Sequence, residues 1–96
     1  MNMTKNKKIQ WRKFSDPEQV KAELQANLPD KATVVDVKQF AASQEFECSE
    51  LVDNIIYCST PAKNFLLIFE AKWLIQFQFR SNRLVEIHVE IGRTAL

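Results

Sequence analysis

The chain is poor in glycine, in histidine and in long apolar runs, and each shortage excludes a class of function. One glycine, Gly92, occurs in 96 residues, which excludes the glycine-rich loops that hold phosphates. The one histidine, His88, and the two cysteines lack the CxxC or HxxxH spacing of metal sites, so we expect no metal and no cofactor. The most apolar stretch, 65–79, contains Glu70 and Lys72. It therefore falls short of the roughly 18 uninterrupted apolar residues of a membrane span.

Catalytic motifs are missing from the sequence as well. Neither GxSxG nor HExxH occurs, and no base with an orienting group can be named around Cys58 or His88. His88 falls on the solvent side of a predicted strand, where we interpret it as a solvated surface histidine. We therefore expect a protein that is not an enzyme.

Charge is distributed unevenly along the chain. Lys and Arg total 13 and Asp and Glu total 12, but the first thirteen residues carry +5 with no acid. We interpret 1–13 as a flexible, solvated basic segment rather than a tether to anionic lipid or nucleic acid, and 14–96 as one domain. Nucleic acid is not an expected partner, because the rest of the chain has a net charge of −4.

The run 9–14 is too short for the apolar part of a secretory signal, so the chain is either cytoplasmic or a mature or trimmed form.

Two helix-start signals lie in the first half of the chain. The Ser-Asp-Pro-Glu run at 15–18 predicts a capping box at the serine and a helix that ends near Asn27. Thr33 with Asp36 repeats the capping signal and predicts a second helix over 34–43. Two helices are therefore expected before every strand.

Strict alternation of apolar and polar residues marks two strands in the last third of the chain, 73–79 and 85–91. Both apolar sets carry odd numbers, and residues directly opposite each other share a face, so the loop between them must be odd in length. A three-residue loop, 80–82, would pair Phe77 with Val85. The hairpin then has one aromatic-rich core face and one wet face.

Shorter signals complete the predicted sheet. Residues 46–48 and 56–58 form a second hairpin, and the apolar run 65–69 predicts a buried strand. A bend or bulge is expected at 70–72, where no turn signal occurs. The sequence predicts an α+β domain in which two N-terminal helices pack on one face of a four- to five-stranded, mostly antiparallel sheet.

Cys48 and Cys58 are the sharpest local feature, because they fall on neighbouring strands of one predicted hairpin. They could form a disulfide, provided that their Cα atoms come within bridging distance. The alternative is two buried thiols, since free cysteine behaves as a small hydrophobe. Whether the cysteines are bridged or free depends on the redox compartment, so the sequence leaves both alternatives open.

Candidate interface residues are apolar side chains that the pattern places outside the core. Trp11 is a large aromatic in the basic segment, and large aromatics anchor binding surfaces. Leu74 and Leu84 fall on the wet face of the predicted sheet, where they would form a small apolar patch bordered by Gln76 and His88.

Four short segments together resemble those of small bacterial exported or lipid-anchored domains in the style of the BamE (SmpA) envelope lipoproteins. The resemblance spans about residues 33–96 and is carried by 48–49, 56–59, 73–79 and 83–85. It implies helices packed on an antiparallel sheet and a place in the periplasm or cell envelope. It implies no catalytic residue.

The sequence is compatible with two functions. The first is a non-enzymatic protein–protein interaction domain of the envelope that binds another protein through its open sheet face or an edge strand. The second is a soluble, cytoplasmic inhibitor or immunity-type protein that blocks a partner enzyme with the acids at 45–53. A homodimer through the wet face would leave the same sequence pattern.

Overall fold

The computed structural model describes residues 7–62 and 69–95, and it confirms the α+β architecture. A short 3₁₀ turn η1 (Trp11–Lys13) is followed by two helices, α1 (Pro17–Asn27) and α2 (Val34–Ser43). Four strands come next: β1 (Glu47–Cys48), β2 (Ile55–Pro61), β3 (Phe69–Arg80) and β4 (Arg83–Ala95). No helix among these residues is both long and apolar enough to cross a membrane.

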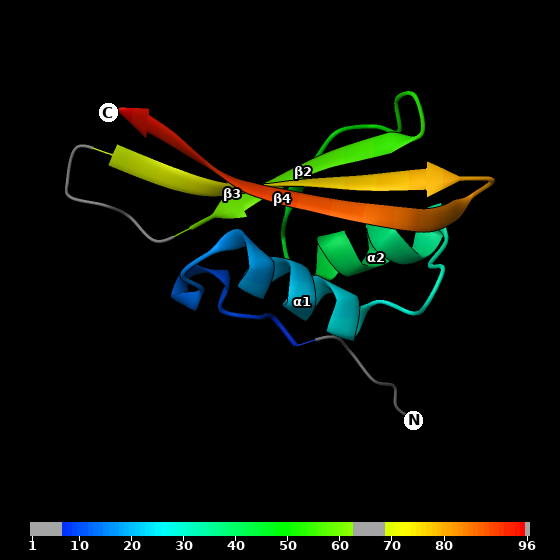
Figure 1. Ribbon diagram of the computed structural model, residues 1–96, viewed down its shortest axis with the longest axis horizontal. Helices are drawn as coiled ribbons and strands as arrows, with labels where there is room; N and C mark the ends of the chain where they lie inside the picture. Colours follow the sequence, from blue (N-terminus) through cyan, green and yellow to red (C-terminus); the bar gives the residue numbers. More distant parts are fainter. Residues whose placement is uncertain (1–6, 63–68, 96) are drawn as a thin grey trace.

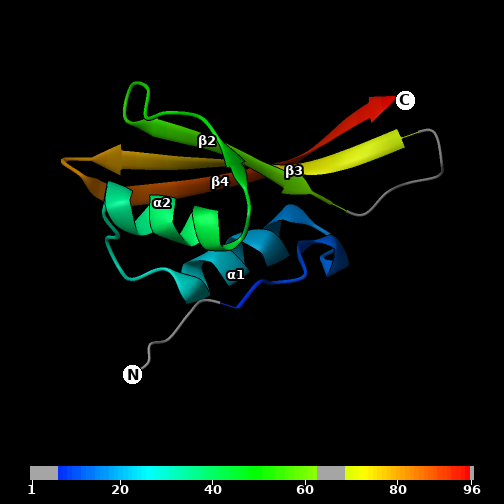
Figure 2. The ribbon, with the colours of Figure 1, turned by 180° about the vertical axis from the view of Figure 1, so that it is seen from behind.

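The four strands form one antiparallel sheet in the order β1-β2-β3-β4, and both helices lie against the same face of it (Figure 1). Figure 1 looks from the side of β4, beneath which α1 lies, and Figure 2 looks from the side of β1 and β2. Between the layers lies one apolar core, whose largest fully buried side chains are Trp73, Phe40, Phe77, Leu24, Ile56 and Ile75. The other face of the sheet has no covering layer within the described residues.

The helices begin at capping boxes, one of which is displaced from its predicted place. At α2 the Thr33 side chain accepts from the Asp36 amide, as predicted. At α1 the N-cap is Asp16 with Gln19, so the predicted box at Ser15 is wrong by one residue. The cause is Pro17, which fits the first helical position and holds the residue before it in an extended conformation.

The β3–β4 hairpin forms as predicted, but its register differs. The turn has two residues, Ser81 and Asn82, both with positive φ (50° and 65°). Such a turn matches the right-handed twist of the flanking strands. A β-bulge next to it makes Val85 the extra residue of β4, and Phe77 pairs with Ile87 instead of Val85.

Upstream of this hairpin, the sequence pattern was less informative. The prediction for 70–72 is a bend or a bulge; β3 pairs with β4 in unbroken register from Phe69 to Gln78, so there is no bulge there. Residues 65–68 of the predicted strand 65–69 lie outside the described residues. The hairpin predicted from 46–48 and 56–58 is confirmed as β1 and β2.

Candidate protein-binding surface

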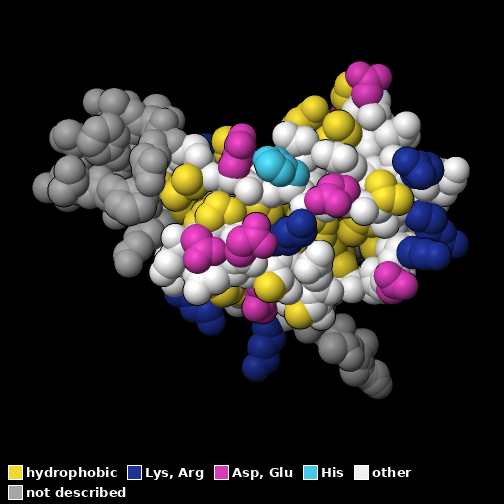
Figure 3. Space-filling model, viewed as in Figure 1, with side chains coloured by type: hydrophobic (Ala, Val, Ile, Leu, Met, Phe, Trp, Pro, Cys, Tyr) yellow, Lys and Arg dark blue, Asp and Glu magenta, His cyan; other side chains and the backbone are white. Residues whose placement is uncertain are grey.

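The outer face of the sheet, on the side away from the helices, is built from cross-strand rows. One row aligns Tyr57, Gln76 and His88, and the next aligns Ser59 with Leu74 and Glu90. Tyr57 is 47% exposed and Leu74 is 37% exposed. In Figure 3 the histidine, in cyan, lies near acidic and apolar side chains. We call these residues, Tyr57, Leu74, Gln76 and His88, the outer-face patch.

Leu74 owes its position to the chain's one glycine. A Cβ placed on Gly92 would lie 2.8 Å from Leu74 Cδ1, closer than real Cβ contacts come. The leucine therefore lies across the bare backbone of the neighbouring strand β4. A side chain at position 92 would push Leu74 out of this place and roughen the outer-face patch.

The predicted interface residues separate into two groups. Leu74, Gln76 and His88 come together on the outer face. Leu84 instead packs partly buried against the core, because the β-bulge turns it to the helix side and leaves Val85 exposed. The wet-face position predicted for Leu84 is therefore wrong.

Trp11 is also removed from the surface. It is 4% exposed and packs edge-on against Phe40 and Phe46, and its carbonyl accepts from the Trp73 indole N–H at 2.9 Å. An aromatic side chain with both its ring and its N–H satisfied inside the core is not available to a partner. The interface role predicted for Trp11 is therefore not compatible with its position.

Gln44, a residue that the sequence pattern did not single out, explains why Trp11 is buried. Its side chain is 1% exposed. Its Oε1 accepts from the Ile9 amide at 2.8 Å and from Trp11 Nε1 at 3.1 Å, and its Nε2 donates to the Lys7 carbonyl at 2.8 Å. The segment predicted as flexible over 1–13 is thus packed on the domain from residue 7 onward.

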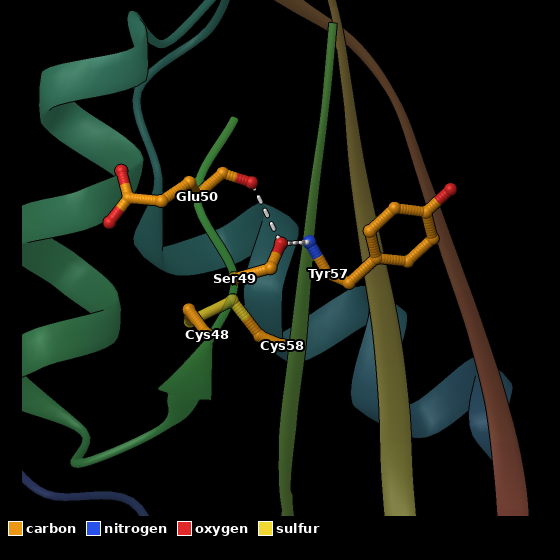
Figure 4. The surroundings of a disulfide bond; sticks show 5 residues. All are labelled: Cys48, Ser49, Glu50, Tyr57 and Cys58. Atoms are coloured by element: carbon orange, nitrogen blue, oxygen red, sulfur yellow. Dashed lines mark hydrogen bonds between the residues drawn. A yellow bond between two sulfur atoms is a disulfide. The ribbon is translucent and has the colours of Figure 1, made fainter. Parts of the chain in front are cut away.

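Cys48 and Cys58 form a disulfide that joins β1 to β2 (Figure 4). The Ser49 amide donates to the Tyr57 carbonyl at 2.7 Å, so the adjacent cysteine pair is a non-hydrogen-bonded one, in which side chains approach most closely. The Tyr57 amide donates to the Ser49 hydroxyl, which in turn donates to the Glu50 carbonyl. This serine hydroxyl takes the place of a backbone acceptor and ends the β1 ladder. Of the two alternatives for the cysteines, the structure has the bridge.

The acids at 45–53 are exposed, and two of them already have lysine partners. Glu45 lies 2.6 Å from Lys8 Nζ, and this contact holds the pKa of the Glu45 carboxyl below its ordinary value of 4.5. Glu50 lies 4.0 Å from Lys38 Nζ. Surface pairs of this kind contribute little to stability, but they neutralise part of the acidic hairpin.

His88 has one acidic neighbour on its own strand, with its Nε2 3.6 Å from Glu90 Oε1. Among residues 7–62 and 69–95, no three metal-ligating side chains come together.

No protein-family model, curated protein or solved structure matches the chain. The interpretation of function therefore depends on the fold and its surfaces.

Proposed function

We propose that the chain is a non-enzymatic protein-binding domain and that the outer-face patch is its contact surface. The observation that carries the proposal is the asymmetry of the sheet: one face is covered by α1 and α2, while the other presents Tyr57 and Leu74 to solvent. Tyrosine is one of the residues that protein interfaces favour, and Leu74 adds exposed apolar surface beside it.

The compartment proposed for this function is the bacterial periplasm or envelope. The support is the Cys48–Cys58 bridge, because disulfides form and persist in oxidising compartments and are rare where thiols are kept reduced. The resemblance to BamE-like envelope domains agrees with this choice. Intact-mass measurement tests it when thiols are alkylated in denaturant at the moment of lysis, since cysteines that then resist alkylation until reduced were bridged in the cell. Free thiols in that sample would contradict an oxidising location.

The contact surface can be tested by site-specific photo-crosslinking in cells. A benzophenone side chain is placed at Tyr57, which is 47% exposed, and, as a control, at Val35, an apolar residue on α2 that is more exposed, at 59%. We expect a discrete protein adduct from position 57 that disappears on adding Leu74→Ser, and none from position 35. Equal adducts from both positions, or none from position 57, would contradict the outer-face patch.

The inhibitor or immunity-type function is the second candidate, and the acids at 45–53 are its surface. Glu47 and Asp53 favour it, because both are exposed and neither has a cationic partner among the described residues. A complex held by these acids weakens strongly as salt is raised, whereas one held by Tyr57 and Leu74 changes little. The salt dependence of a captured complex therefore separates the two functions.

A further inference from the structure

The two edges of the sheet differ in how well they are protected against pairing with another strand. On the β2 side, β1 pairs Glu47 with Ser59, and the following Ser49 amide donates to the Tyr57 carbonyl. The strand β2 itself ends at Pro61, which has no N–H to donate. On the other side, β4 is 13 residues long, and its stretch 84–92 contains neither proline nor lysine. Edge strands of this length and regularity are templates for pairing unless something blunts them.

The backbone groups that β4 presents along its free edge follow from the pairing pattern. The Phe79 amide donates to the Asn54 carbonyl on the β2 side, so odd-numbered residues of β3 turn their backbone groups toward β2 and even-numbered ones toward β4. Because Gln76 pairs with His88, the N–H and C=O groups of Ile87, Val89 and Ile91 point away from the sheet. No hydrogen bond within the described residues reaches these six groups.

The free edge is limited at one end only. The Leu84 amide donates to the Ala32 carbonyl at 2.7 Å, and the β-bulge follows at Val85. Lys21 reaches from α1 to Glu86, with Nζ 3.3 Å from Oε2, as a partly exposed pair. The open stretch therefore begins at Glu86 and continues along β4. Figure 1 views this edge directly, and α1 lies beneath it rather than across it.

We propose that this edge pairs with the same edge of a second copy of the chain, antiparallel and with Val89 opposite Val89. That register makes hydrogen-bonded pairs of Val89 with Val89 and of Ile87 with Ile91, which places apolar side chains together on the helix side. On the outer face it places His88 opposite Glu90 of the second copy, twice by symmetry. The two sheets become one continuous eight-stranded sheet.

Three neighbouring registers of the same pairing are less favourable than the one centred on Val89. If the register is centred on His88, Glu86 of one copy lies opposite Glu90 of the other. If it is centred on Glu90, the two Glu90 side chains lie opposite each other. Like charges directly opposite each other are destabilising. A centre at Ile87 would need the backbone of Leu84 and Val85, which the Ala32 contact and the β-bulge already occupy.

Cysteine crosslinking tests the register directly. His88→Cys and Glu90→Cys are made as separate proteins, each with one free thiol because Cys48 and Cys58 are bridged. In the proposed register, position 88 faces position 90 of the other copy as a non-hydrogen-bonded pair, close enough for a disulfide. Mild oxidation of the mixture is expected to give a reducible species of twice the 11.2 kDa chain mass, and each variant alone little. No crosslink in the mixture, or equal crosslinking of each variant alone, would overturn the register.

A charge swap tests the same contact without cysteine and with the fold intact, since both side chains are exposed. In sedimentation of the full chain we expect a dimer, a dissociation constant raised about tenfold by His88→Glu, and recovery in His88→Glu/Glu90→Lys. Gln39→Glu is the matched control, because it adds the same charge at an exposed position of α2, away from the β4 edge, and it should leave the dimer unchanged. A wild-type chain that stays at 11.2 kDa over the whole concentration series would refute the pairing.

Discussion

Opening the Cys48–Cys58 bridge should destabilise the domain by an amount that the sequence separation sets. The bridge spans ten residues, and closing a loop of that length removes about 2.7 kcal/mol of chain entropy from the unfolded state at 25 °C. The native contacts around it are few, because β1 has only two residues and the Cys48 side is exposed. Most of the effect should therefore arise from loop closure rather than from packing.

The measurement is equilibrium unfolding in urea, with and without reductant, followed by the fluorescence of Trp11 and Trp73, which are both buried. With an m-value of about 1.3 kcal/mol per M for a domain of this size, reduction should lower the midpoint by about 2 M. It should lower the melting temperature by roughly 10–20 °C. Cys48→Ser/Cys58→Ala provides the matched control, because its midpoint should equal that of the reduced protein and should not change when reductant is added.

A particular result would refute this reasoning. If alkylation and mass confirm that the wild-type bridge is closed, yet reduction shifts the midpoint by less than about 0.4 M, the loop-closure term is not the stabilising one. The unfolded chain would then hold these two residues close together without the bridge. An increase in stability on reduction would mean that the bridge opposes the native arrangement of β1 and β2.

Three further predictions concern single side chains. Gln44→Leu removes the acceptor of the buried Trp11 indole N–H and should lower the free energy of unfolding by about 2–4 kcal/mol in urea titration. Asn82→Ala removes an acceptor at the start of α2 and places alanine at a positive φ, so it should cost about 1–2 kcal/mol, measured in the same way. Lys8→Met should return the pKa of Glu45 toward its ordinary value in an NMR titration. Because the folded pKa is lowered, the small stability that Lys8 provides is present above pH 4.5 and lost as pH falls, and a wild-type carboxyl that titrates normally would contradict the contact.

Local patterns predicted those parts of the fold that local physics determines. The helix 34–43 follows from a capping box that involves only Thr33 and Asp36, and the faces of β3 follow from a period of two. The hairpin register could not be predicted in the same way. A three-residue loop and a two-residue turn with a one-residue β-bulge give the same parity, so alternation does not distinguish them, although they place Leu84 and Val85 differently.

The candidate surface was predictable only where it lies on regular strands. Leu74, Gln76 and His88 were found because alternation assigns each to the outer face. Trp11 was misplaced because its burial depends on Gln44, 33 residues away, and no local spacing signals that contact. That β4 is an edge strand could likewise not be predicted from the sequence, because the order of strands in the sheet decides which strand lies at the edge.

The disulfide also decides how many neighbours the sheet can accept. With β1 fastened to β2, β4 is the one long edge strand among the described residues, so the proposed pairing of identical chains would close after a single step. β1 pairs through just two residues, and without the bridge it can detach and uncover the edge of β2. A sheet with two free edges adds copies without limit, as fibres do. If the edge of β4 pairs as proposed, the oxidised chain should assemble to a dimer and no further, whereas the reduced chain should continue to add copies.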